Sequence, residues 1–143
     1  MVHLHDEGSH FEVPIEQVWK LNEDHATNGH KIHPNMKNQK YEMINETTTH
    51  FSWDTEMNGQ MVHNKAKITN YAPVGTVLEL VEGPMAGSTI FNFYTPKGNR
   101  TAVTVVGNFK SEMMPEEMLK QAAQQFLDTA HNEDKAYLQT AKM

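Results

Sequence analysis

Apolar residues recur every three to four positions from Pro115 to Met143, which is the longest stretch of helical periodicity in the chain. The periodic positions are Met118, Leu119, Ala122, Ala123, Phe126, Leu127, Ala130, Tyr137, Leu138 and Ala141. This spacing places one apolar stripe along a helix, and such a stripe needs a surface to pack on. Pro115 suits the first helical position, and the two glutamates after it favour the positive end of the helix dipole. The pattern predicts a long C-terminal helix of about 40 Å that lies across a broad, concave surface.

The first quarter of the chain predicts one strand and two short helices. A loose alternation of apolar and polar residues indicates a strand over about 8–13 or longer. A proline then opens a helix over about 14–22 with one apolar face. Asp24 can cap a second short helix, which Gly29 weakens and His33-Pro34 ends. The two helices are expected to form a V-shaped pair.

Alternation with a period of two replaces the helical spacing from about residue 38 onward. The predicted strands cover about 40–45, 47–57, 60–71, 76–82, 88–95 and 100–110. Asn58-Gly59 is a residue pair that two-residue hairpin turns favour, so the strands on either side should fold back on each other. Phe51 and Trp53 share one strand face, and His50 and Asp54 share the other. The order of elements is typical of a single α+β domain over residues 1–143.

Charge and composition narrow the range of partners. The net charge is −6 at pH 7 with no basic cluster, which argues against nucleic acid and anionic membranes as partners. The chain has no cysteine, so disulfides, thiolate metal sites and cysteine nucleophiles are excluded, and a reducing cytoplasm is the simplest location. No apolar run approaches the roughly 20 residues that span a bilayer, so no membrane insertion is expected.

Four segments mark the ends of the predicted elements: 11–19 (FEVPIEQVW), 71–73 (YAP), 87–101 and 107–109 (GNF). In this order, and followed by the terminal helix, they resemble the helix-grip superfamily (SRPBCC), which includes START domains, birch-pollen-allergen-like proteins and polyketide cyclase-like proteins. The resemblance implies a seven-stranded curved antiparallel sheet around the C-terminal helix, two short helices after the first strand, and an apolar cavity inside. Members bind lipids, hormones or polyketides, and some act as cyclases, dehydratases or chaperone co-factors. The glycine-rich loop of the pollen-allergen branch has no counterpart in residues 44–47.

The apolar faces of the sheet and the terminal helix are the expected walls of a ligand pocket, typically of about 300–1,000 Å³. The predicted ligand-binding residues are Trp19, Phe51, Trp53, Phe91, Phe93, Met118, Ala122 and Phe126. The plain alternative is that these side chains fill an ordinary core, because large apolar residues are usually inside.

Histidine is the unusual residue type, and eight of the nine precede residue 64. His25, His30 and His33 raise the question of a metal site, because imidazole is the commonest metal ligand. Their spacing argues against one, since on an unbroken helix only His30 and His33 share a face. We expect solvent-facing or capping histidines, with no metal and no cofactor. Three more lie near an expected sheet edge and would at most bind a stray ion: His3, His5 and His10.

No residue stands out as catalytic, so the catalytic residue is unknown. The polar side chains on the predicted strands that could act as acids or bases are Glu42, His50, Asp54, His63, Glu79 and Tyr94. Alternation along the strands places His50, Asp54 and His63 on the outer face, and puts Tyr94 opposite Phe93. No serine lies in a nucleophile-elbow context.

The apolar stripe of the terminal helix thins over residues 131–135 before Tyr137 and Leu138 resume it. Either the helix bends there or its end overhangs the sheet, and an overhanging apolar end would favour a homodimer. The expected function is the binding of a small apolar or amphipathic ligand, such as a lipid or a polyketide, between the sheet and the terminal helix. Two alternatives stay open: a polyketide cyclase or dehydratase with a polar residue in the same cavity, and a chaperone co-factor-like interaction module.

Overall fold

The computed structural model describes residues 1–141 as one curved sheet with two helices. The elements are β1 (Val2–Phe11), α1 (Ile15–Ile32), β2 (Lys37–Met43), β3 (Thr48–Met57), β4 (Gln60–Tyr71), β5 (Gly75–Glu82), β6 (Thr89–Lys97), β7 (Arg100–Phe109) and α2 (Glu116–Ala141). The strands pair antiparallel in the order β1-β7-β6-β5-β4-β3-β2. The last two positions of the predicted terminal helix, 142 and 143, lie outside the described residues.

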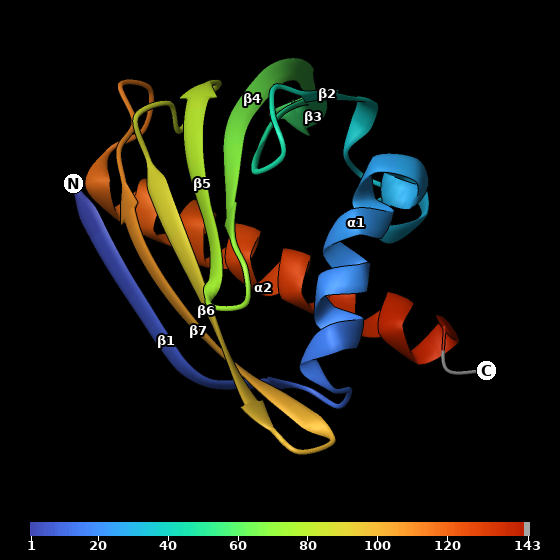
Figure 1. Cartoon of the computed structure of the whole chain (residues 1–143). Helices are drawn as coiled ribbons and strands as arrows, with labels where there is room; N and C mark the ends of the chain where they lie inside the picture. The colour runs from blue at the N-terminus through green and yellow to red at the C-terminus, as the bar shows by residue number, and fades with distance from the viewer. Residues whose placement is uncertain (142–143) are drawn as a thin grey trace.

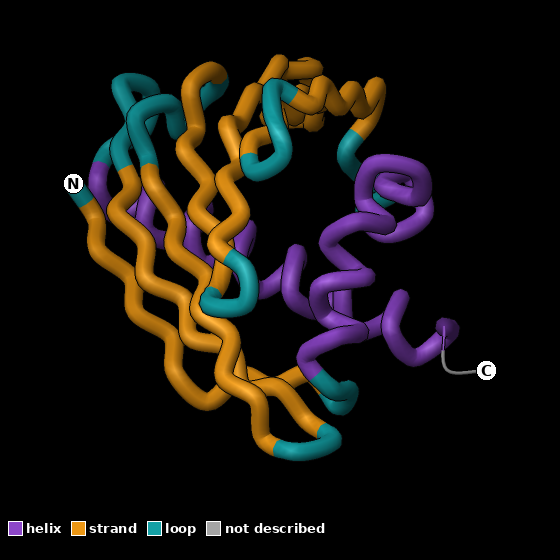
Figure 2. Tube along the Cα trace, in the orientation of Figure 1, coloured by secondary structure: helices purple, strands orange, loops and turns teal. Residues whose placement is uncertain are grey.

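The sheet curves so that α2 lies across its concave side and α1 stands at its open end (Figure 1). Both helices lie on one side of the sheet (Figure 2). The predicted helix-grip architecture, a seven-stranded antiparallel sheet around a long C-terminal helix, is therefore confirmed. Neither α1 nor α2 is long and apolar enough to cross a membrane.

Two apolar clusters hold α2 against the rest of the fold. Near its start, Leu119 and Ala123 are buried against the sheet in a cluster with Phe51, Trp53 and other side chains of the concave face. Near its end, Leu138 is buried in a second cluster that includes Leu21 of α1. The apolar stripe of α2 is thus used at both ends, and the helix is held by the sheet at one end and by α1 at the other.

The prediction of two short helices after the first strand is wrong, because one helix runs without a break from Ile15 to Ile32. Gly29 is buried inside this helix, with the side chain of Gln39 lying directly over it. Gln39 Nε2 lies 3.0 Å from the carbonyl oxygen of Gly29 and 3.1 Å from that of His33. The glycine therefore marks a close approach between α1 and β2, where a side chain would not fit, and not a helix break.

Positive φ angles explain the hairpin between β3 and β4 and the length of β1. Asn58 and Gly59 both have positive φ, at 52° and 77°, which is the backbone of the predicted two-residue hairpin between β3 and β4. The first strand starts at Val2, earlier than the predicted 8–13, because Gly8 has φ 100° and lies at a break in the register of β1 with β7. A glycine bulge bends the strand there without ending it.

Candidate functional site

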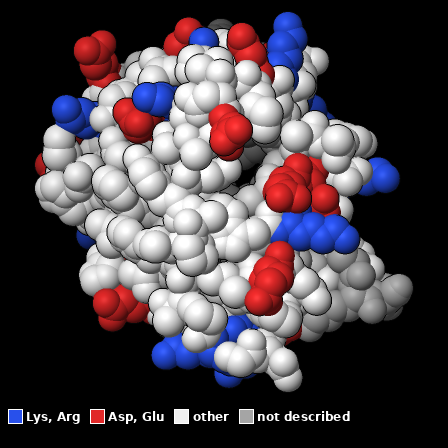
Figure 3. All heavy atoms as spheres, viewed as in Figure 1, with Lys and Arg blue, Asp and Glu red and all other residues white. Residues whose placement is uncertain are grey.

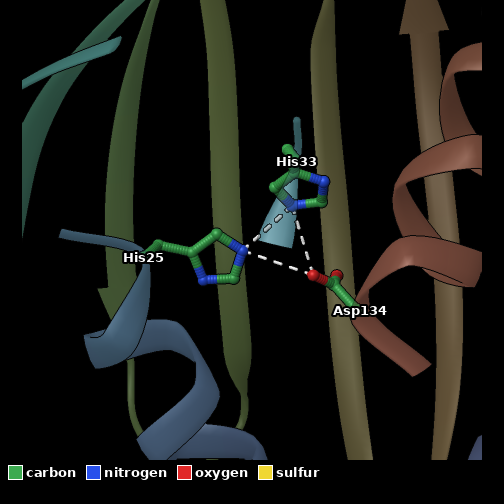
Figure 4. A group of neighbouring side chains, drawn as sticks. All are labelled: His25, His33 and Asp134. Atoms are coloured by element: carbon green, nitrogen blue, oxygen red, sulfur yellow. Dashed lines mark hydrogen bonds and ion pairs between the residues drawn. The ribbon is translucent and has the colours of Figure 1, made fainter. Parts of the chain in front are cut away.

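Two histidines and an aspartate meet where the end of α1 faces α2 (Figure 4). His25 lies on α1, His33 follows the helix directly, and Asp134 lies on α2. His25 Nε2 is 3.0 Å from His33 Nε2. Asp134 Oδ1 is 3.3 Å from His25 Nε2 and 3.2 Å from His33 Nε2. Three electron-pair donors from opposite ends of the chain therefore converge on one point.

Both imidazole rings are oriented by the oxygen that their other nitrogen contacts. His25 Nδ1 lies 2.8 Å from the carbonyl oxygen of Leu21, and His33 Nδ1 lies 2.9 Å from Glu133 Oε1. Carbonyl and carboxylate oxygens only accept hydrogen bonds, so each Nδ1 must carry a proton and donate it. This fixes Nε2 of both rings toward Asp134. Because Glu133 and Asp134 are consecutive in α2, one turn of that helix contacts both nitrogens of His33.

The charges of the cluster support one another. Burial lowers the pKa of His33, but the hydrogen bonds and negative charges of Asp134 and Glu133 outweigh it, and the net shift is upward. Burial raises the pKa of Asp134, but the contacts with His25 and His33 outweigh it, and the net shift is downward. Burial, together with the charge of Asp134, also raises the pKa of the Tyr41 phenol. The cluster therefore favours an ionised carboxylate and a positive charge beside it.

A cleft of about 430 Å³ opens between the C-terminal turns of α1 and strand β2, next to this cluster. It is lined by His25, Ala26, Thr27, Gly29, His30, Pro34, Met36, Lys37, Asn38, Gln39 and Tyr41. His25 belongs to both the cleft and the cluster, so the cluster can be reached from the surface. The space-filling view shows this side of the molecule hollowed near its centre, between the sheet and α1 (Figure 3).

Further unpaired or weakly paired polar atoms lie deeper inside. Tyr94, on the inner face of β6, accepts a hydrogen bond of 3.4 Å from Asn22 Nδ2, and burial raises the pKa of its phenol. Trp19 packs edge-on against Tyr94, with ring centroids 5.6 Å apart. The buried Nε1 of Trp19 has no hydrogen-bond partner among the described residues. Buried donors usually have a hydrogen-bond partner, so a water or a ligand is expected beside this atom.

Comparison with known proteins identifies the architecture. No family model and no curated protein matches the sequence. The structure is similar to the Zhui aromatase/cyclase from Streptomyces sp. R1128, with a TM-score of 0.83 and 10% identity over 99% of this chain and 97% of that one. It is also similar to a START superfamily protein from Mycobacterium smegmatis, with a TM-score of 0.79 and 14% identity over 97% of this chain and 98% of that one. A third neighbour is Ara h 8.0201, with a TM-score of 0.77 and 13% identity over 97% and 98% of the two chains.

The chain has the START-like, helix-grip fold. Identities of 10–14% over nearly the full length of each neighbour establish this fold and leave the ligand open.

Within the helix-grip fold, part of the predicted ligand-binding set faces the interior. Phe51 and Trp53 are buried on the concave face and stack with ring centroids 4.7 Å apart, and Tyr41 stacks on Phe51 at 4.3 Å. Phe126 is half-buried and packs against the same cluster. Two other predicted residues are half-buried, Trp19 on α1 and Ala122 on α2. A role in ligand binding stays a prediction for these residues.

Three predicted residues do not face the interior. On β6, Ile90 is buried in the core and Tyr94 packs on Trp19, so Phe91 and Phe93 point to the opposite, outer face. Phe93 is 41% exposed there and stacks on Phe91. Met118 is 53% exposed, because its neighbour Leu119 takes the buried position on α2. Because apolar residues occupy both faces of β6, the sequence does not show which face is buried. An error of one residue in the alternation assigns every side chain of a strand to the wrong face.

The cluster was not recognised from the histidine spacing. His25 and His33 come together because His33 lies just past the end of α1, whereas His30, which helical geometry had paired with it, is exposed at the cleft. Asp134 is distant in sequence. The available signal was the thinning of the apolar stripe over 131–135, because α2 faces the polar cluster there. The alternative of an overhanging helix end is wrong, since Leu138 is buried against α1.

The other acid–base candidates are dispersed over the fold. His63 Nδ1 lies 2.8 Å from Asp54 Oδ1 on the outer face, where the alternation had placed both. His50 and His63 line a second cleft of about 510 Å³, over β2–β5, whose lining is mostly charged or polar. Tyr94 lies on the opposite face of β6 from Phe93, as the alternation predicted. It is Tyr94 that faces the interior, and Phe93 that faces outward. Glu42 is exposed, and Glu79 is half-buried on a strand position paired with Lys67.

Proposed function

We propose that the protein binds a small amphipathic molecule between the concave face of the sheet and α2, with the cleft between α1 and β2 as its opening. The observation that supports this most directly is the position of that cleft. Its volume of about 430 Å³ falls in the usual range for ligand sites, and Tyr41 and Met36 on its wall also pack against the apolar core. One opening therefore gives access to both apolar and polar surface.

The apolar part of the ligand would contact half-buried side chains of the concave face. Ile68 and Leu78 are cross-strand partners on β4 and β5. Both pack against the apolar cluster of the concave face without being fully buried. Covering such surface contributes about 25 cal/mol per Å², so about 200 Å² of it supplies about 5 kcal/mol of gross binding energy. Lipids, polyketides and similar molecules provide this kind of surface.

The polar part of the ligand would face the α1 end of the hollow between the concave face of the sheet and α2. The unpaired Nε1 of Trp19 is a donor there, and the phenol of Tyr94 is close to it. Pairing a buried donor of this kind removes an unfavourable feature of the free protein. This polar end favours an amphipathic ligand over a purely apolar one.

A second candidate is an enzyme of the cyclase or dehydratase type. It is favoured by the buried His33 and the half-buried Asp134, whose pKa values are displaced and which lie beside a cleft. One of the structural neighbours is described as an aromatase/cyclase. In this function, the same hollow would hold a polyketide-like substrate, and the cluster would move a proton.

Binding can be tested with 1-anilinonaphthalene-8-sulfonate, an amphipathic dye whose fluorescence rises in apolar surroundings. We expect saturable 1:1 binding to the wild type and at least tenfold weaker binding to Ile68→Trp, in which an indole fills the hollow. Phe93→Trp is the matched control, because the same side chain is introduced on the outer face of the sheet.

Equal affinity in the wild type and both variants would contradict the proposal, as would loss of binding in Phe93→Trp alone. Urea unfolding of each variant shows whether it is folded. Native mass spectrometry of freshly purified protein adds a second measurement: a co-purified small molecule supports binding, whereas a bare chain with a stable protein partner supports an interaction module instead.

A further inference from the structure

The cluster of His25, His33 and Asp134 has the dimensions of a metal site. The edges of the triangle formed by its two Nε2 atoms and Asp134 Oδ1 are 3.0, 3.2 and 3.3 Å. Ligand atoms around a tetrahedral ion with bonds of about 2.05 Å lie about 3.3 Å apart, and those on one face of an octahedron lie about 2.9 Å apart. The three atoms therefore already lie within a few tenths of an ångström of the positions that a transition-metal ion requires.

The protonation of the rings gives an independent reason. Each Nδ1 donates its hydrogen to an oxygen, that of Leu21 or that of Glu133, so in the neutral rings both Nε2 atoms carry a lone pair. These lone pairs point toward each other and toward a carboxylate oxygen. Asp134 Oδ1 is buried and makes no well-aligned hydrogen bond, although both rings are close to it. Three acceptors facing one another repel unless a proton or a metal ion lies between them.

The surroundings also match those of known metal ligands in general. A histidine that binds a metal usually donates its other N–H to a carboxylate or a backbone carbonyl, which fixes the ring and raises its basicity. Glu133 and the Leu21 carbonyl have these two roles here. Because His25 also lines the cleft, a fourth ligand such as water or a bound molecule can approach from that side.

We propose that His25 Nε2, His33 Nε2 and Asp134 Oδ1 together bind one divalent first-row transition-metal ion, with Zn²⁺ and Fe²⁺ as the ions that best match this set of ligands. Two nitrogen donors and one carboxylate disfavour Mg²⁺ and Ca²⁺, which prefer oxygen ligands throughout. Glu133 acts as a positioning residue through His33. This site is independent of the amphipathic ligand proposed above, because none of its three ligands belongs to the apolar wall.

The test uses Co²⁺ and Zn²⁺ added separately to the full chain after dialysis against EDTA. Titration calorimetry with Zn²⁺ and the visible absorption of Co²⁺ should both show one site per chain. Asp134→Asn and His25→Gln should each weaken binding by more than about a hundredfold, and Glu133→Gln by about 10–100-fold. His30→Gln is the matched control, since His30 lies on the same helix, is exposed and lines the same cleft.

Zn²⁺ should also raise the thermal unfolding midpoint of the wild type and of His30→Gln, but not that of Asp134→Asn. Circular dichroism shows whether each variant is folded, and His25→Gln, which changes a residue of the other helix, keeps the test valid if Asp134→Asn does not fold. The proposal is overturned if no ion binds, or if binding survives Asp134→Asn and His25→Gln. It is also overturned if binding disappears in His30→Gln. Ile68→Trp should bind Zn²⁺ like the wild type, so failure of the ligand proposal and failure of the metal proposal give different results.

Discussion

Gly29→Ala tests how α1 is joined to β2 behind the candidate site. In an ordinary helix interior this substitution stabilises the protein by about 0.8–1.0 kcal/mol, because alanine loses less backbone entropy than glycine. Here a Cβ at position 29 would overlap Gln39 Oε1 and lie 3.0 Å from Tyr41 Oη. Gln39 must therefore leave its place before the alanine can fit.

The cost of displacing Gln39 follows from its contacts. Its Nε2 lies 3.0, 3.1 and 3.0 Å from the carbonyl oxygens of Gly29, His33 and Met36. An amide group has two hydrogens to share among these three oxygens, so the equivalent of two hydrogen bonds is lost, at about 0.5–1.5 kcal/mol each. The loss of about 1–3 kcal/mol exceeds the gain in helix propensity. We expect Gly29→Ala to lower the free energy of unfolding by up to about 2 kcal/mol and the melting temperature by up to roughly 6 °C.

A double-mutant cycle with Gln39→Ala tests whether the cost of Gly29→Ala comes from displacing Gln39. Once Gln39 is removed, the overlap disappears, and Gly29→Ala should raise stability by up to about 1 kcal/mol. Urea unfolding followed by fluorescence of Trp19 and Trp53 measures all four proteins. The reasoning is refuted if Gly29→Ala is more stable than the wild type, or if the effect of the alanine has the same sign with and without Gln39.

Three further predictions concern the interior. Burial and the nearby Lys135 lower the pKa of His131, which stacks on Phe11. The stability that this histidine contributes is therefore complete above its ordinary pKa and is lost as the pH falls. His131→Phe should lose less stability than the wild type between pH 7 and pH 5, as measured by urea unfolding. Phe109→Ala removes a side chain that is 0% exposed and should cost about 3–5 kcal/mol of unfolding free energy, and a cost below about 1 kcal/mol would contradict the assigned core. Thr101→Val removes a buried hydrogen bond of 2.9 Å to the loop before α1 and should lower the free energy of unfolding by about 1–2 kcal/mol in the same assay, whereas an unchanged value would show that the bond contributes nothing.

Periodicity was enough to predict the strands and the long terminal helix, and the resemblance to the helix-grip superfamily implied how they are arranged. The stripe of α2, the alternation in β3 and the Asn58-Gly59 turn are local patterns, and each was confirmed at the position where it was read. Local patterns failed where a contact distant in sequence decides the outcome. Gly29 looks like a helix breaker until Gln39 is seen to occupy the space beside it. Phe91 and Phe93 look like pocket residues until the pairing of β6 with its neighbours fixes which face is inside.

The candidate site was harder to predict because its members share no segment. His25 and His33 are both candidate metal ligands in the sequence, but regular helix geometry separates them, and their approach depends on the backbone turn at the end of α1. Asp134 does not stand out in the sequence, because charged residues on a helix are usually solvated. A polar interruption in an otherwise buried stripe is the signal that would have identified it.

The side-chain contacts between α1 and α2 have a consequence for how the chain is made. The hydrogen bond from His33 to Glu133 spans 100 positions, and that from Tyr137 to Asp24 spans 113. A nascent chain leaving the ribosome has all seven strands available before it has the helix that covers them. During that interval the aromatic inner surface is uncovered, and exposed apolar surface on a partly folded chain favours aggregation. Premature stop codons upstream of α2 should therefore yield insoluble fragments instead of partly active ones.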